Sequence, residues 1–235
     1  MTEMSEKAGR QLSVILLGAG GHAKVLVHML LGAHQPILGC TDPKETQSPI
    51  LDLKRLGDDE AVFQYAPDEV QLVNGVGSAS STVLREKLYS RFKAKGYSFL
   101  SVIDPSATIA FGVQLSEGVQ IMAGAILQPG SSVGADAIVN TGAIIDHDCV
   151  VGPHVHIAPG AVLSGCVRVD SGAHVGTGAC VIQGVSIGAR SIIGAGAVVI
   201  DDVPPGVTSV GVPARALDTS LTRAFGEPTS QDERK

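Results

Sequence analysis

The sequence predicts a small α/β domain followed by an all-β parallel β-helix, and two observations carry this prediction. From Ile103 to Pro204 the chain divides into seventeen consecutive hexapeptides without an insertion, and each begins with Ile, Leu or Val. Ahead of this repeat, short apolar runs alternate with segments of helical periodicity. That alternation is typical of a parallel sheet covered by helices.

The hexapeptides have two further regularities. Their fifth residue is always Ala, Val, Ser or Cys, and their fourth is Gly in ten of the seventeen. One branched aliphatic side chain per hexapeptide can fill a narrow interior, and glycine tolerates the backbone angles of a tight turn. Three such faces make a coil of about eighteen residues, so the repeat predicts between five and six stacked coils.

The α/β domain is expected to contain four strands and two helices. The expected strands are Leu12–Leu17, Gln35–Cys40, Val70–Val76 and Tyr97–Val102. The expected helices are Ala23–Gly32 and Ser80–Lys95, with a charged loop at 44–60. This is about one mononucleotide-binding half of a Rossmann-like domain. We therefore divide the chain into a polar leader (1–11), this domain (12–102), the β-helix (103–217) and a polar tail expected to be disordered (218–235).

Composition narrows the class of protein. The net charge of −6 argues against a surface that binds nucleic acid. The four cysteines form no CxxC pair and are expected to be reduced, buried thiols: Cys40, Cys149, Cys166 and Cys180. The N-terminus lacks a signal-peptide core, and no apolar stretch reaches membrane-spanning length. We expect a cytoplasmic protein without membrane insertion.

A glycine-rich turn follows the first strand. The residues Gly18-x-Gly20-x-x-Ala23 match a phosphate-binding fingerprint, and Asp42 lies at the end of the second strand. Amides at a helix start can hold phosphates, and an acid in this place can bind a ribose. Since only one half of a dinucleotide fold is visible, a nucleotide that carries a sugar fits better. His22 at the helix start either donates to a phosphate or sugar or is simply solvated, and the sequence leaves both alternatives open.

Histidines stand out within the repeat. Asp146-His147-Asp148 occupies a predicted outward turn, and a histidine flanked by acids has the composition of a general base with an orienting carboxylate. His156 and His174 both occupy the sixth position of their hexapeptides, so they should stack on neighbouring coils, either in a solvent-facing ladder or at a site. A metal would need three or four convergent ligands, so none is expected.

Residues 12–217 resemble the family of sialic acid O-acetyltransferases and nucleotide-aminosugar N-acetyltransferases. The motifs that carry the resemblance are GAGGH, CTD, NGVGS, NTGAIIDHDC and VGVPA. The resemblance implies a left-handed parallel β-helix, a homotrimer and acetyl-CoA as co-substrate, with no permanently bound cofactor.

The resemblance also implies roles for individual residues. His147 matches the catalytic histidine and Asp148 the acid that follows it. Residues expected around the nucleotide-sugar are Gly20, Gly21, His22, Asp42 and Gly77, with Asn140 near the reacting groups. Residues expected along the pantetheine arm of acetyl-CoA are His156, Gly165, Thr177, Ala195 and Gly196.

The expected function is acetyl-CoA-dependent N-acetylation of a UDP-linked deoxyaminosugar in bacterial glycan precursor synthesis. His147 would take the proton from the attacking amine, and no side-chain nucleophile is expected because Cys149 falls at an inward position. Two alternatives are O-acetylation of sialic acid and a non-enzymatic nucleotide-binding scaffold.

Overall fold

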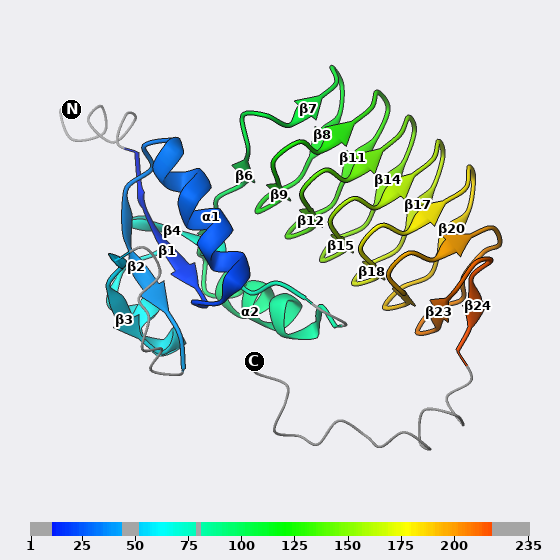
Figure 1. Cartoon of the computed structure of the whole chain (residues 1–235). Coiled ribbons are helices and arrows are strands. Elements are labelled where there is room, and N and C mark those ends of the chain that lie inside the picture. Colours follow the sequence, from blue (N-terminus) through cyan, green and yellow to red (C-terminus); the bar gives the residue numbers. More distant parts are fainter. Residues whose placement is uncertain (1–10, 44–51, 79–80, 218–235) are drawn as a thin grey trace.

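The computed structural model describes residues 11–43, 52–78 and 81–217, and Figure 1 shows an α/β domain beside a stack of triangular coils. This confirms the predicted fold class. Residues 1–10 of the predicted leader and the whole predicted tail, 218–235, lie outside the described residues.

The N-terminal domain is a five-stranded parallel sheet of order β3-β2-β1-β4-β5. Its strands are β1 (Ser13–Leu17), β2 (Ile37–Thr41), β3 (Arg55–Gly57), β4 (Val70–Asn74) and β5 (Ser98–Phe99). Its helices are α1 (Gly21–Gly32), α2 (Val83–Lys93) and a 3-10 helix, η3 (Asp59–Gln64). Alternate side chains of β1 enter two cores, one shared with α1 and one shared with α2, so the two helices cover opposite faces of the sheet.

Two sequence predictions for this domain were wrong in detail. Part of the predicted loop, 44–60, forms β3 and the start of η3, while 44–51 lies outside the described residues. β3 is too short to show the alternation that reveals a longer strand. The predicted strand Tyr97–Val102 is divided between two sheets, because β5 joins the α/β domain and β6 (Val102–Ile103) pairs with the β-helix.

The β-helix consists of three parallel sheets whose strands are two residues long, apart from the three-residue β23, and it ends in a short antiparallel pair. We call them the inner sheet, which faces the α/β domain, and the second and third sheets, in chain order. The inner sheet contains β6, β9 (Gln120–Ile121), β12 (Ile138–Val139), β15 (His156–Ile157), β18 (His174–Val175), β21 (Ile192–Ile193), β23 (Thr208–Val210) and β24 (Arg215–Ala216). The second sheet contains β7 (Thr108–Ile109), β10 (Ile126–Leu127), β13 (Ile144–Ile145), β16 (Val162–Leu163), β19 (Cys180–Val181) and β22 (Val198–Val199). The third sheet contains β8 (Gln114–Leu115), β11 (Ser132–Val133), β14 (Val150–Val151), β17 (Arg168–Val169) and β20 (Ser186–Ile187).

The hexapeptide pattern corresponds to the interior and the turns of these coils. From Ile121 onward every first-position side chain is buried, and from Val119 onward every fifth-position side chain is buried. All ten fourth-position glycines have φ between 64° and 83°, the left-handed region that favours glycine. The inferred interior and turns are therefore confirmed.

A buried polar cluster joins the two domains. Arg85 on α2 forms an ion pair of 2.9 Å with Asp136 on a β-helix turn, and both side chains are fully buried. Asp136 also accepts from Asn74 at 3.0 Å and contacts His154 Nδ1 at 3.0 Å. Arg85 further donates to the carbonyl oxygens of Asn74 and Val76. The cluster therefore ties the loop that follows β4 to the β-helix.

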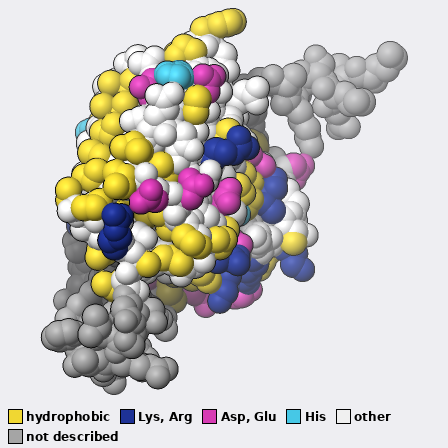
Figure 2. Space-filling view, turned by 90° about the vertical axis from the view of Figure 1, so that its right-hand side faces the viewer, with side chains coloured by type: hydrophobic (Ala, Val, Ile, Leu, Met, Phe, Trp, Pro, Cys, Tyr) yellow, Lys and Arg dark blue, Asp and Glu magenta, His cyan; other side chains and the backbone are white. Residues whose placement is uncertain are grey.

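The end of the β-helix formed by its last coils carries exposed hydrophobic side chains. Figure 2 shows this face, on which acidic side chains lie between the hydrophobic ones. Exposed hydrophobic residues of the last coils include Ile200, Val210 and Val212. Among the described residues, no helix combines the length and the apolar character needed to cross a membrane.

Candidate active site

A pocket of about 490 Å³ lies where the α/β domain meets the inner sheet. The strand order reverses between β1 and β4, and ligands of open α/β sheets bind beyond the carboxyl ends of strands at such a point. The loops after β1 and β4 form one wall, and the turns after β12, β15 and β18 form the other. The lining residues are Gly21, His22, Val25, Gly77, Ser78, Asn140, His156, Ala158, Pro159, His174 and Thr177.

The two loops of the α/β domain approach each other closely in this wall. A Cβ atom at Gly77 would lie 3.1 Å from Cβ of His22, so glycine permits the contact. Asp42 Oδ2 accepts a hydrogen bond of 3.0 Å from the amide of Ala19 and so supports the glycine-rich turn. Gly20 and Asp42 are not among the residues lining the pocket.

His22 is partly buried in the pocket wall, and its ring N–H is engaged within the protein. Its Nε2 lies 2.7 Å from Gln120 Oε1, and Gln120 Nε2 donates to the carbonyl of Asn74. This second bond fixes the orientation of the Gln120 amide, so Nε2 of His22 carries the proton and Nδ1 is left as an acceptor. Burial, with a smaller effect of Arg85, lowers the pKa of His22 to about 4. His22 is therefore neutral at pH 7.

His156 and His174 stack on neighbouring coils as predicted, with ring centroids 5.0 Å apart. They do not form a solvent-facing ladder, because they are only 5% and 7% exposed beneath the α/β domain. Ser78 Oγ lies 2.7 Å from His156 Nδ1 and 3.0 Å from His174 Nδ1. Burial lowers the pKa of His156 to about 2, helped by the neighbouring His174, and burial also lowers the pKa of His174.

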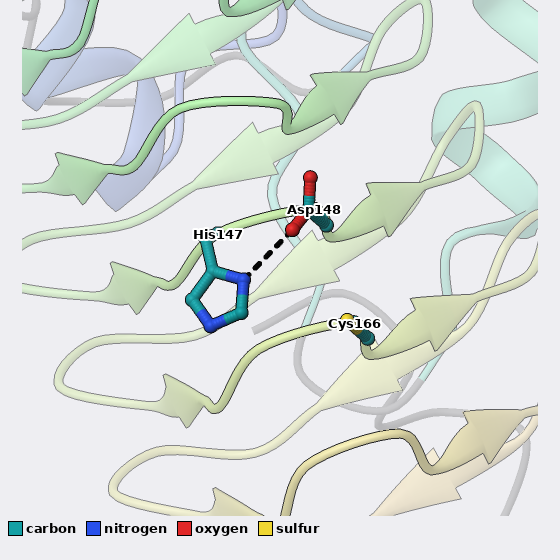
Figure 3. A group of neighbouring side chains, drawn as sticks. All are labelled: His147, Asp148 and Cys166. Atoms are coloured by element: carbon teal, nitrogen blue, oxygen red, sulfur yellow. Dashed lines mark hydrogen bonds and ion pairs between the residues drawn. The ribbon is translucent and has the colours of Figure 1, made fainter.

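His147 and Asp148 lie on a different corner of the coil, between the second and third sheets. Figure 3 shows the imidazole with Nδ1 toward Asp148 and the other nitrogen facing away. The Nδ1–Oδ2 distance is 2.8 Å, and the side chains are 50% and 63% exposed. The hydrogen bond to Asp148 raises the pKa of His147. With Nδ1–H donated to the carboxylate, the neutral ring keeps a lone pair on Nε2, as a general base requires.

Gly165 lies directly against this imidazole on the next coil. A Cβ atom at Gly165 would come 2.4 Å from His147 Nε2 and 2.5 Å from Cε1. The backbone of Gly165 does not have a positive φ, so only this close approach requires glycine. Gly165 therefore packs against the imidazole of His147, the predicted base, and a larger residue at this position would displace the ring.

Two of the cysteines, Cys149 and Cys166, lie at the same corner as His147. Cys149 is buried as predicted, and burial raises the pKa of its thiol to about 11, so it is a poor nucleophile. Cys166 and Cys180 are exposed, contrary to prediction, because they occupy turn and outward positions of their hexapeptides. Ligand atoms of His147, Asp148 and Cys166 lie within 4.8 Å of one another (Figure 3). All three are exposed, and the Asp148 carboxylate is engaged by His147, so we interpret the group as a base with its acid.

The structure thus gathers some of the predicted residues and separates others. Residues assigned to the sugar (Gly21, His22, Gly77 and Asn140) and to pantetheine (His156 and Thr177) line one pocket. Ala195 and Gly196 lie one coil beyond Thr177, where the amide of Gly196 donates to the Thr177 carbonyl at 2.8 Å. His147, Asp148 and Gly165 lie at the other corner of the second sheet.

Sequence reasoning missed three polar residues of the pocket region. Ser78 belongs to the NGVGS motif, so its place after β4 was a usable signal. His174 was noticed for its stacking but received no role. Gln120 gave no signal, because a glutamine at an outward position of the repeat is normally solvated.

Comparison with known proteins places these features in a class. Residues 13–92 match the family described as the PglD N-terminal domain. A solved structure of a histidine-to-asparagine variant of perosamine N-acetyltransferase from Caulobacter crescentus, in complex with CoA and GDP-perosamine, is 37% identical. The match covers 88% of this chain and 97% of that one, with a TM-score of 0.82. No curated protein matches the chain.

Two further structures are similar over nearly their whole length. The acetyltransferase domain of PglB from Neisseria gonorrhoeae, in complex with acetyl coenzyme A, is 32% identical; the match covers 89% of this chain and 100% of that one, with a TM-score of 0.82. WeeI from Acinetobacter baumannii is 28% identical, with 88% and 100% coverage and a TM-score of 0.79.

The fold and the two clusters define an acetyltransferase of the hexapeptide β-helix class. At these identities and coverages, the chain belongs to the family of nucleotide-sugar N-acetyltransferases that join a PglD-type N-terminal domain to a hexapeptide β-helix. The family resemblance drawn from the sequence motifs is confirmed.

Proposed function

We propose that this acetyltransferase transfers the acetyl group of acetyl-CoA to the amino group of a nucleotide-linked deoxyaminosugar, in the synthesis of a bacterial glycan precursor. The observation that carries the proposal is the pocket at the strand-order reversal, which adjoins a β-helix whose corner bears the His147–Asp148 pair. The Caulobacter relative was solved with CoA and GDP-perosamine, which supports N-acetylation over O-acetylation of sialic acid.

The chemistry follows from the tautomer of His147. The amine nitrogen attacks the thioester carbonyl carbon, and His147 Nε2 takes the proton that the nitrogen loses. The resulting imidazolium is stabilised by Asp148 on Nδ1. The carbon–sulfur bond then breaks, CoA leaves as the thiolate, and the imidazolium can return the proton to the sulfur. The high pKa of Cys149 supports direct attack without an acyl-enzyme.

We further propose that the active site is completed by a second copy of the chain within a homotrimer. In one chain the pocket and His147 lie on opposite edges of the second sheet, so one corner of a coil holds the sugar-binding groups and another holds the base. The outward side chains of that sheet include a partly exposed apolar stripe, which supports burial against another subunit: Ile126, Ile144, Val162 and Val198. Packing of prisms would bring His147 of one copy to the pocket of the next.

A panel assay tests the reaction. The purified chain is incubated with acetyl-CoA and with UDP- and GDP-linked aminosugars, since the sequence resemblance implied UDP and the Caulobacter relative was solved with a GDP-sugar. Thiol release and product mass are measured. We expect acetylation of an amino group. Acetylation of a sialic acid hydroxyl would favour the O-acetyltransferase, and no thiol release with any acceptor would favour the scaffold.

The shared site has its own test. His147→Ala should lower kcat by about 10²–10⁴-fold with little change in substrate binding. Mixing this variant with a variant damaged in the pocket, Asn140→Ala, should restore activity if the subunits exchange, because some interfaces then hold both intact halves. A monomer mass by light scattering at micromolar concentration would contradict the trimer.

A further inference from the structure

A chain of hydrogen bonds runs through the pocket and ends at His174. The amide of Thr141 donates to Asn140 Oδ1 at 2.8 Å, and Asn140 Nδ2 lies 3.0 Å from His156 Nε2. Ser78 Oγ then bridges His156 Nδ1 and His174 Nδ1. Within the described part of the chain, His174 Nε2 has no hydrogen-bond partner, although the residue is 93% buried and lines the pocket.

The donor and the acceptor of each hydrogen bond can be assigned in turn, starting from the backbone amide of Thr141. A backbone amide can only donate, so the Asn140 oxygen faces Thr141 and its NH₂ group faces His156. His156 Nε2 must therefore accept, and the neutral ring carries its proton on Nδ1, which donates to Ser78. Among the described residues, the Ser78 hydroxyl proton has no acceptor other than His174 Nδ1. His174 is thus left with its proton on Nε2.

We propose that His174 is a ligand-binding residue that donates its Nε2–H to a phosphate oxygen of the nucleotide-sugar, and that Ser78 is the positioning residue that fixes the donating tautomer. The inference rests on the proposed function and names a contact within it. His174 Nε2 opens onto the pocket, so its N–H can donate there to an acceptor of the ligand in place of water.

The surroundings favour a phosphate as the acceptor. No lysine or arginine is among the lining residues, so a diphosphate has to be held by N–H donors. Gly21 lines the pocket and begins α1, a helix of twelve residues whose N-terminus has no side-chain cap, so its first backbone amides are available to an anionic group. Ser78 lies on the facing loop and holds His174 in position. The negatively charged phosphate oxygens would then accept hydrogen bonds from neutral N–H groups, namely His174 Nε2 and the first amides of α1.

Two substitutions separate the donor from the packing. In His174→Asn the amide occupies the place of Nδ1 and keeps the contact with Ser78 but loses the Nε2 donor. In His174→Gln the amide reaches the place of Nε2 and can still donate. We expect His174→Asn to weaken binding of UDP or GDP, whichever the wild type binds, by roughly 10- to 100-fold in calorimetry. His174→Gln should weaken it by several-fold at most, and the KM for acetyl-CoA should stay unchanged in both.

Two outcomes of that experiment would overturn the proposal. One is equal losses in the Asn and Gln variants. The other is an unchanged nucleotide affinity together with a raised KM for acetyl-CoA or for the whole nucleotide-sugar, which would place the acceptor elsewhere.

The tautomers are read independently of any ligand. Nitrogen-15 NMR of histidine-labelled, ligand-free protein should show His156 protonated on Nδ1 and His174 on Nε2. In Ser78→Ala, His174 should become a mixture of tautomers, while His156→Gln assigns the signals. A wild-type His174 protonated on Nδ1 would refute the proposal. Failure of the wild type to acetylate any aminosugar or to bind UDP or GDP would instead refute the proposed function, while the tautomers remained as derived.

Discussion

Gly165→Ala displaces the predicted base without altering it. The added methyl carbon would meet His147 Nε2 at 2.4 Å and Cε1 at 2.5 Å, about 1 Å inside a normal contact. The backbone at 165 accepts alanine, so the ring must give way. Because His147 is half exposed it can rotate outward, which breaks its hydrogen bond to Asp148. A misplacement of about 1 Å can cost about 10²-fold in rate, and we expect kcat to fall by that order.

A double-mutant cycle isolates this cause. In a His147→Ala background there is no ring to displace, so Gly165→Ala should then change kcat by less than about twofold. Gly32→Ala is a matched control, because a Cβ atom there meets nothing within 4 Å. Steady-state kinetics of the four variants, with thermal melts to verify folding, give the comparison. Losses that multiply in the double variant would show that Gly165 acts on something other than His147, such as the acetyl-CoA arm to which the sequence assigned it.

Four other predictions follow from single contacts. Asp148→Asn should move the acidic limb of the kcat/KM profile to lower pH, because the carboxylate raises the pKa of His147; an unmoved limb would contradict the pairing. Acid should destabilise the fold, because burial lowers the pKa of His156 to about 2 and that of His22 to about 4, so these histidines are protonated in the unfolded chain first. The urea-unfolding free energy should fall as the pH drops below 6, and the fall should be shallower in His156→Gln by about 1.4 kcal/mol per pH unit; an unchanged slope in this variant would contradict the reasoning. Arg85→Met should lower stability by about 3–5 kcal/mol by leaving Asp136 charged and buried without its partner; a loss under 1 kcal/mol in chemical denaturation would refute this. Cys166→Gly should raise stability by about 1 kcal/mol, and a lower melting temperature would reveal an unseen contact.

The repeat could be predicted from sequence because each coil depends on local rules. In each hexapeptide the position of the aliphatic residue predicts which side chain points into the β-helix, and the position of the small residue predicts where the chain turns. The burial of the first-position side chains from Ile121 onward agrees with this prediction. The α/β domain gave weaker signals. β3 was missed because three residues carry no periodicity, and the division of Tyr97–Val102 depends on which sheet edge lies within reach.

The candidate site was predictable where a motif names the residue and unpredictable where contact between domains decides it. His147–Asp148 is local, since neighbours in sequence form the pair. His22, by contrast, contacts Gln120, which lies 98 residues further along the chain, and this contact decides which ring nitrogen of His22 carries the proton. His174 likewise acquires its tautomer from Ser78, on a loop of the other domain.

At some hexapeptides the fourth residue is not glycine, and most of these residues use their side chain to form an ion pair. Five non-glycine residues adopt the left-handed turn, with φ between 55° and 61°: Asp136, Asp148, His154, Cys166 and Arg190. This conformation costs an ordinary residue roughly 1–2 kcal/mol, so the side chain should bring a compensating interaction. Four of them do: Asp136 pairs with Arg85, Asp148 with His147, His154 with Asp136, and Arg190 with Glu86. Three of these four pairs involve either the His147–Asp148 corner or the cluster that holds the loop after β4. In such a repeat, a polar residue in place of the turn glycine is therefore a signal that its side chain forms an ion pair, either with a neighbour on the same turn, as Asp148 does, or with another element, as Asp136 does with Arg85.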